Sequence, residues 1–227
     1  MEVNYVCSLG SFCFPANYMR THNLQKCSYP FDYILTGPEV ITDCLKDDFK
    51  LFLDKSRHER LVNEGNRISS NHKLYGKFSN GKNFIGLKVL NETFKHHDIT
   101  DDDIYASFER KIERFRILLK KDEPKLFLLF AQDEEYDRRR VDELNRVLKE
   151  KTSNFQILCI SMFNDFNFRY EVEDIDNIKY IKTYTYGRNL GDKINCEVEN
   201  ELFHQMIQKY YVFNVKDDIK VEKGVAS

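Results

Sequence analysis

Six consecutive apolar residues, LFLLFA, fill positions 126–131 of the chain. A run this short suits a strand, and strands that are apolar throughout are typical of parallel sheets covered on both faces. Two further runs have the same character, FQILCISM at 155–162 and IKYIKTYTY at 178–186. Together the three segments predict the centre of a largely parallel, buried sheet.

Helical patterns lie around these strands. The clearest one begins with DDD at 101–103, which supplies an N-cap and first-turn acids, and it continues with apolar residues at helical spacing. Other amphipathic segments lie at 14–24, 39–53, 141–151 and 198–211. The segment VNYVCSLG, 3–10, predicts a first strand that ends in a glycine turn. This order of elements predicts a three-layer, Rossmann-like α/β fold, with a largely parallel sheet and helices on both faces.

The 227 residues are enough for one ordinary domain. We expect a single α/β domain over 1–214, with an irregular insertion around 55–100, and a polar C-terminal tail over 215–227. The insertion is polar and weakly periodic, and within it HKLYGKF, 72–78, and NFIGLKVL, 83–90, predict short strands.

The composition excludes several classes of protein. Charged residues make up 32% of the chain but the net charge is only −2, so no overall positive field exists to bind nucleic acid. No segment approaches the roughly 20 apolar residues of a membrane span, and the N-terminus resembles no secretory signal. We therefore expect an intracellular, cytoplasmic protein that makes no membrane contact and whose six cysteines are thiols. Zinc-site spacing is missing, so we expect neither a metal nor another cofactor.

Cys13 follows the turn SLGS, 8–11, and lies where the first helix is predicted to begin. Unpaired N–H groups and the helix dipole at such a position favour a thiolate, lower the thiol pKa and can receive an oxyanion. We expect the backbone around Gly10, Ser11 and Phe12 to form that anion site. In the alternative interpretation, Cys13 packs between strand and helix as a small apolar side chain.

A thiol nucleophile needs a base, and FKHHDIT, 94–100, holds the dense group of imidazoles in the sequence. His96 and His97 are neighbours, so on an extended segment only one of them faces a pocket. Because these two histidines and Asp98 are consecutive, they cannot easily converge on one metal ion. In the alternative interpretation, the three residues form an exposed polar loop.

Asp32 lies among aromatic rings in SYPFDYI, 28–34. A carboxylate in such a setting is either exposed between buried rings or buried with a partner. The sequence leaves both outcomes open.

The motifs SLGSFCFPA, CSYPFDYI and FKHHD, followed by the basic helix ERKIERFRILL and the strand KLFLLF, resemble a family of unknown function described as papain-like cysteine peptidases. The resemblance covers roughly residues 5–131 and is most specific in the first two motifs. It implies a cysteine hydrolase in which Cys13 matches the nucleophile, His97 the base, and Asp32 the aspartate of the Pro-Phe-Asp motif. The apolar strands differ from the antiparallel barrel of papain, so our fold prediction rests on the periodicity.

Three functions are compatible with these patterns. The first is a cysteine hydrolase or acyl-transfer enzyme that acts on a peptide or small acyl substrate, with His97, or else His96 or Asp98, as the base. The second is a transferase or binding protein in which the SLGS turn holds a phosphate or a nucleotide sugar, with Arg188 or the arginines 138–140 as partners. The third is a non-catalytic scaffold.

Overall fold

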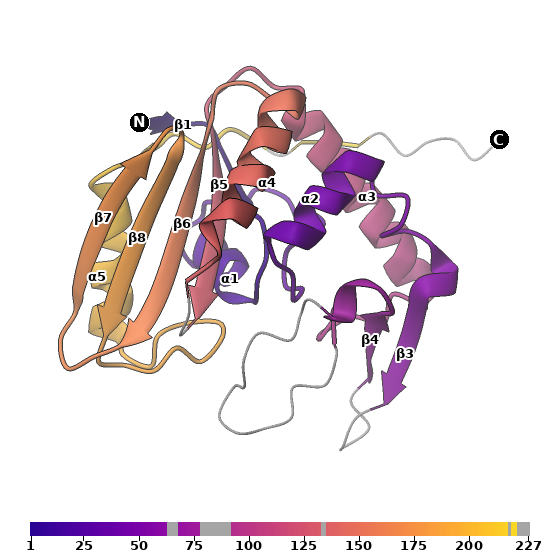
Figure 1. Ribbon diagram of the computed structural model, residues 1–227, viewed down its shortest axis with the longest axis horizontal. Coiled ribbons are helices and arrows are strands. Elements are labelled where there is room, and N and C mark those ends of the chain that lie inside the picture. The colour runs from indigo at the N-terminus through magenta and orange to yellow at the C-terminus, as the bar shows by residue number, and fades with distance from the viewer. Residues whose placement is uncertain (63–67, 78–91, 133–134, 218, 222–227) are drawn as a thin grey trace.

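The computed structural model describes residues 1–62, 68–77, 92–132, 135–217 and 219–221, and its centre is a five-stranded sheet (Figure 1). In spatial order the strands are β2 (Tyr5–Ser8), β5 (Lys125–Gln132), β6 (Phe155–Asn164), β8 (Ile178–Thr185) and β7 (Arg169–Ile175). The first four run parallel, and β7 is antiparallel to β8. The prediction of an α/β fold with a largely parallel sheet is confirmed.

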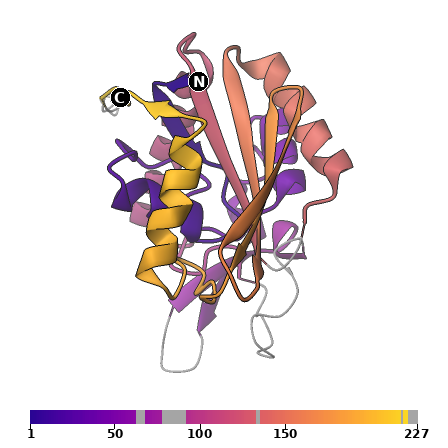
Figure 2. The ribbon, with the colours of Figure 1, turned by 90° about the vertical axis from the view of Figure 1, so that its left-hand side faces the viewer.

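Helices pack around this sheet because the side chains of β5 alternate between two separate clusters of core residues. Phe130 of β5 packs edge-on against Phe14 and Phe203 in one cluster. Phe127 of the same strand packs against Phe115 in the other cluster. Figure 2 shows the last helix, α5, on one side of the sheet and α4 on the other. The described α-helices are α1 (Phe14–Thr21), α2 (Pro38–Asp47), α3 (Asp102–Leu119), α4 (Arg138–Lys151) and α5 (Glu197–Gln208).

Two smaller pairs of strands complete the structure. Near the N-terminus β1 (Glu2–Val3) pairs in parallel with β9 (Val212–Phe213), and Lys216 N–H donates to the Asn4 carbonyl at 2.9 Å. In the predicted insertion, β3 (His58–Val62) pairs antiparallel with β4 (Ile68–His72). Short 3-10 helices occupy Lys55–Arg57 and Tyr75–Lys77.

The structure differs from the predicted elements in three places. The helix predicted over 39–53 ends at Asp47, because Asp48 and Phe49 adopt left-handed backbone conformations with φ of 55° and 62°. In place of the strand predicted over 72–78, the structure has the end of β4 and then a 3-10 turn. The strand predicted over 83–90 lies outside the described residues. Strand β7 was not predicted at all.

Candidate active site

The turn between β2 and α1 is held in a conformation that ordinary residues avoid. Gly10 and Ser11 both have positive φ, 82° and 88°, and a Cβ atom at Gly10 would collide with Thr36 Oγ1. Gly10 N–H donates to Ser8 Oγ at 3.0 Å, and Ser11 N–H donates to Thr36 Oγ1 at 3.2 Å. These two N–H groups, which we expected at an oxyanion site, are therefore already engaged. The N–H groups of the first turn of α1 follow directly, where a helix lacks intrahelical acceptors.

Cys13 is the N-cap residue of α1, and its side chain is half-buried. Burial raises the pKa of the thiol, while the positive charge of Lys95 lowers it and the negative charge of Asp192 raises it. The net direction is opposite to the one expected from a helix N-terminus alone, because the loss of hydration outweighs the favourable charges. The resting thiol therefore keeps its proton at neutral pH.

His97 is half-buried at the end of the FKHHD segment and stands edge-on to the ring of Phe108, with 5.6 Å between ring centroids. Burial lowers the pKa of His97 to about 4, and the charges of Lys111 and His96 act in the same direction. Its Nε2 atom is buried and has no hydrogen-bond partner within the described part of the chain. His97 is therefore neutral at neutral pH, and the same burial makes it a weaker base than a free histidine.

The two alternative bases have different surroundings. His96 is exposed on the same turn as Lys95. Asp98 accepts a hydrogen bond from Thr100 N–H at 3.1 Å and forms an ion pair with Arg60, with 3.1 Å between Arg60 Nε and Oδ2. Asp98 therefore has a local role in holding the turn, whether or not it also acts in chemistry.

Asp32 is buried, with 1% of its surface exposed. Its Oδ2 accepts hydrogen bonds from Tyr29 N–H and Gln25 Nε2, both at 2.9 Å, whereas Oδ1 is buried without a partner among the described residues. Burial raises the pKa of Asp32 to about 7 against the opposing effects of the Tyr29 N–H, the Lys111 charge and Gln25. Of the two outcomes that the sequence left open, the structure shows burial with partners.

One hydrogen bond joins two of these segments: Leu35 N–H donates to the Thr93 carbonyl at 2.9 Å, which ties the segment after Asp32 to the segment before the histidines. The charge of Lys111 of α3 lowers the pKa of both Asp32 and His97, and the charge of Lys95 lowers that of Cys13. Among the described residues, Cys13 and His97 make no hydrogen bond with each other, so the structure does not join the two through a direct contact.

Two residues of this region were not identified from the sequence. Lys95 lies within the FKHHD motif, where its positive charge beside the histidines was an available signal. Tyr33 has a φ of 60°, a strained value for a bulky side chain, and its hydroxyl is buried without a described partner. Burial raises the pKa of Tyr33, the positive charge of Arg20 opposes this effect, and Asp32 and Cys13 add to it when they are ionised. No sequence signal marks Tyr33.

Several other features bear on the alternatives. The three arginines at 138–140 each pair with a carboxylate, respectively Glu173, Asp137 and Glu39. All six cysteines are free thiols. Within the described ranges there is no cluster of three or more histidine, cysteine, aspartate or glutamate side chains that could hold a metal ion. The same residues include no helix with the length and apolar character needed to cross a membrane.

A family model matches most of the chain. The family model DUF1796, whose description reads "Putative papain-like cysteine peptidase", matches residues 4–165. The matched range contains Cys13, Asp32 and His97. No curated protein and no solved structure matches the chain.

Proposed function

The chain belongs to this family of papain-like cysteine peptidases, and on that premise we propose that it is a cysteine hydrolase with Cys13 as its nucleophile. The observation that carries the proposal is the position of this thiol. It is half-buried, follows a strained turn at the carboxyl end of β2, and begins a helix beside a lysine of the histidine segment. Ligand sites of parallel sheets characteristically lie at the carboxyl ends of their strands.

Because the resting thiol is protonated, it loses its proton during the attack on the substrate and not before it. As the thiol approaches a peptide or small acyl carbonyl, its proton passes to Nε2 of His97, and the sulfur forms a bond to the carbonyl carbon. The carbonyl π electrons move to oxygen, which the N–H groups at the start of α1 and the Tyr33 hydroxyl stabilise. Collapse expels the amine or alcohol, which takes the proton from His97, and water then hydrolyses the thioester. The positive charge of Lys95 favours the transient thiolate.

Asp32 has a positioning role in this proposal. The charge of Lys111 opposes protonation of His97, and an ionised Asp32 offsets that charge from within the same region. The proposal also includes a cytoplasmic setting, since six free thiols persist in a reducing compartment.

An acyl-transfer assay tests the proposal. The protein is mixed with p-nitrophenyl acetate, release of p-nitrophenolate is followed, and the acetylated residue is found by peptide mass spectrometry. We expect a hydroxylamine-sensitive acetyl group on Cys13, no turnover in Cys13→Ala, and a rate about a hundredfold lower in His97→Asn. Cys196→Ala and His96→Asn are matched controls, because Cys196 is also a half-buried helix N-cap and His96 is adjacent in sequence.

Two results would reject this function. One is acetylation of Cys196 or of lysines alone, with the wild-type rate retained in Cys13→Ala. The other is equal rates in the His96 and His97 variants, which would remove His97 as the base.

The rival proposal is a transferase or binding protein that holds a nucleotide sugar at the same turn. This proposal includes a three-layer, Rossmann-like arrangement of the sheet and helices. It also requires positively charged side chains that are available to phosphates. The pairing of Arg138, Arg139 and Arg140 with carboxylates weakens it, and the exposed Arg188 remains as a partner. A thermal-shift screen with nucleotide sugars distinguishes the two, because a ligand at about 100 times its Kd stabilises by about 2.7 kcal/mol. A scaffold would give neither turnover nor a shift.

A further inference from the structure

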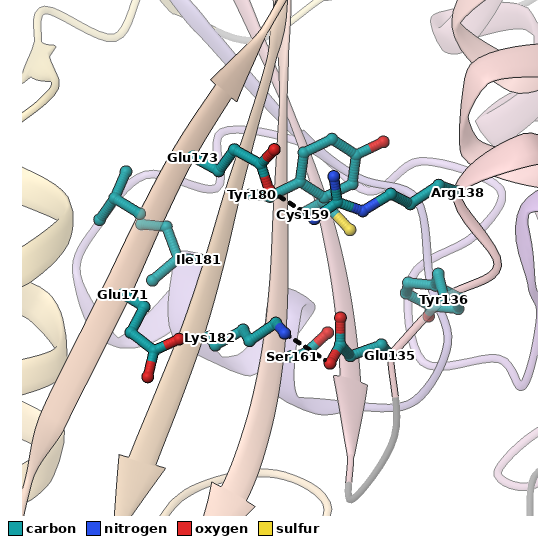
Figure 3. A pocket seen from close by; sticks show the side chains of 11 residues that line it. Glu135, Tyr136, Arg138, Cys159, Ser161, Glu171, Glu173, Tyr180, Ile181 and Lys182 are labelled. Carbon is teal, nitrogen blue, oxygen red and sulfur yellow. Dashed lines mark hydrogen bonds and ion pairs between the residues drawn. The ribbon is translucent and has the colours of Figure 1, made fainter.

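A cavity lies on the face of the sheet between α4 and the strands β8 and β7, and its lining includes Tyr136, whose hydroxyl contacts Ser11 Oγ of the turn before α1 (Figure 3). Its volume is about 230 Å³. This is about eight times the ~30 Å³ that one water molecule occupies in the liquid, so it fits a small organic molecule.

The strand register builds the floor of the cavity. Residues two apart on a strand share a face, and pairing across β6, β8 and β7 aligns them in rows. The first row is Cys159, Tyr180 and Glu173, and the second row is Ser161, Lys182 and Glu171. Consecutive rows are about 7 Å apart.

Two ion pairs cross the cavity from its floor to its walls, as Figure 3 shows. Lys182 Nζ contacts Glu135 Oε1 at 2.7 Å, and Arg138 at the start of α4 pairs with Glu173. The Arg138 guanidinium also lies over the Tyr180 ring, 4.9 Å from its centroid. The cavity therefore offers a positive and a negative group at each of two places.

Two hydroxyl groups lie at this cavity. Ser161 lines it and is buried, with 6% of its surface exposed. The Tyr180 hydroxyl is buried and has no hydrogen-bond partner in the described ranges. A buried hydroxyl without a partner is costly, so a polar ligand that completes its bonding is favoured.

We propose that this cavity binds a small zwitterion, a molecule with one carboxylate and one ammonium group a few bonds apart. The carboxylate is received by Lys182 Nζ and the Ser161 hydroxyl in the second row. The ammonium is received by the carboxylate of Glu173 in the first row. The two ion pairs already balance each other's charges, so a zwitterion adds no net charge to the site, whereas a ligand with a single charge adds one that these pairs do not compensate. Neither Cys13 nor His97 lines the cavity, so the proposal does not depend on the hydrolase proposal.

The probe is 4-aminobutyrate, whose charges are separated by three methylene groups, a length suited to the spacing of the rows. It is titrated to about 20 mM into the ¹⁵N-labelled full chain, a range that covers millimolar binding, and amide shifts are followed by NMR. Butyrate and n-butylamine are the matched controls, because each keeps the carbon skeleton and only one of the two charges.

We expect saturable shifts at residues 161 and 180–182 with 4-aminobutyrate, and a Kd about tenfold higher for either control and for the variants Lys182→Gln and Ser161→Ala. Lys46→Gln, which removes the ion pair between Lys46 and Glu143 at 2.6 Å on another side of α4, leaves the Kd unchanged. The proposal is overturned by the absence of saturable shifts, by shifts confined to other residues, or by equal affinity for butyrate or n-butylamine. Circular dichroism of the variants shows that their fold is retained.

Discussion

Asp32 links the stability of the fold to pH, because its buried carboxyl group has a pKa of about 7 in place of its ordinary value of 3.8. Below pH 3.8 the folded and unfolded chains both hold the proton, and between 3.8 and 7 only the folded chain holds it. The free energy of unfolding therefore falls as pH rises through this window, by about 1.4 kcal/mol per pH unit. Above pH 7 the loss is complete and constant.

Asp32→Asn removes this dependence while it keeps an oxygen that accepts from Tyr29 N–H and Gln25. The difference in free energy of unfolding between variant and wild type should grow by roughly 3 kcal/mol in favour of the variant between about pH 5 and about pH 8. Taking the difference cancels the contributions of other titrating groups.

The assay is urea denaturation followed by circular dichroism at several pH values. Asp142→Asn, at an exposed aspartate of α4, is the control for the loss of a carboxyl group elsewhere in the chain. A constant difference for Asp32→Asn, within about 0.5 kcal/mol over the same range, would show that Asp32 does not change its ionisation there.

Four further substitutions test individual contacts and charges. Lys95→Met should slow alkylation of Cys13 by iodoacetamide at about pH 8 by roughly two- to fivefold, because the lost charge is worth up to about 1 kcal/mol. The alkylation rate is measured by peptide mass spectrometry, and an unchanged rate would show that Lys95 does not affect Cys13. Tyr33→Phe should raise the free energy of unfolding in urea by about 1 kcal/mol, since its buried hydroxyl lacks a described partner. Tyr18→Phe, which loses a 2.9 Å hydrogen bond between the Tyr18 hydroxyl and His204, should lower the free energy of unfolding by about 1 kcal/mol. Equal changes in the free energy of unfolding for the Tyr33 and Tyr18 variants would contradict both predictions. Tyr136→Phe removes a hydroxyl that contacts Ser11 Oγ and donates to the Phe130 carbonyl, so amide exchange at Ser11 should accelerate.

The sequence predicted the elements whose signals are local. The apolar run 126–131 is the centre of β5, and Asp101 caps α3 by accepting from the N–H groups of Asp103 and Ile104. Strand β7 escaped prediction because its sequence, RYEVEDI, carries a charge at most positions, and, among the described residues, Tyr170 is the one residue of the strand that packs against a core cluster. An outermost strand can be this polar, so its pattern resembles that of a loop.

The end of α2 shows that a helical spacing of buried residues can continue beyond the end of the helix itself. Phe49 and Phe52 are buried at positions that continue the helical spacing, so the pattern extends the predicted helix beyond Asp47. Their burial is achieved after the chain has turned through left-handed conformations at Asp48 and Phe49. Apolar spacing reports which residues are buried, and it does not report the backbone path between them.

The location of Cys13 could be predicted, but its ionisation could not. The strand, the glycine turn and the helix that place the thiol are adjacent in sequence. Its pKa depends instead on burial by distant segments and on the charges of Lys95 and Asp192, which lie far along the chain. The left-handed Tyr33 likewise depends on tertiary packing, because no local pattern favours that conformation for an aromatic residue.

The exposed edge of β7 has a consequence for how copies of the chain meet. β7 is the last strand in the sheet, so its outer backbone groups face no further strand of that sheet. Unpaired edges of this kind can recruit another molecule and extend into fibres. Along β7, however, Arg169, Glu171, Glu173 and Asp174 are all exposed. Two edges brought together would crowd these mostly acidic side chains, so the strand that closes the zwitterion cavity also keeps neighbouring molecules apart.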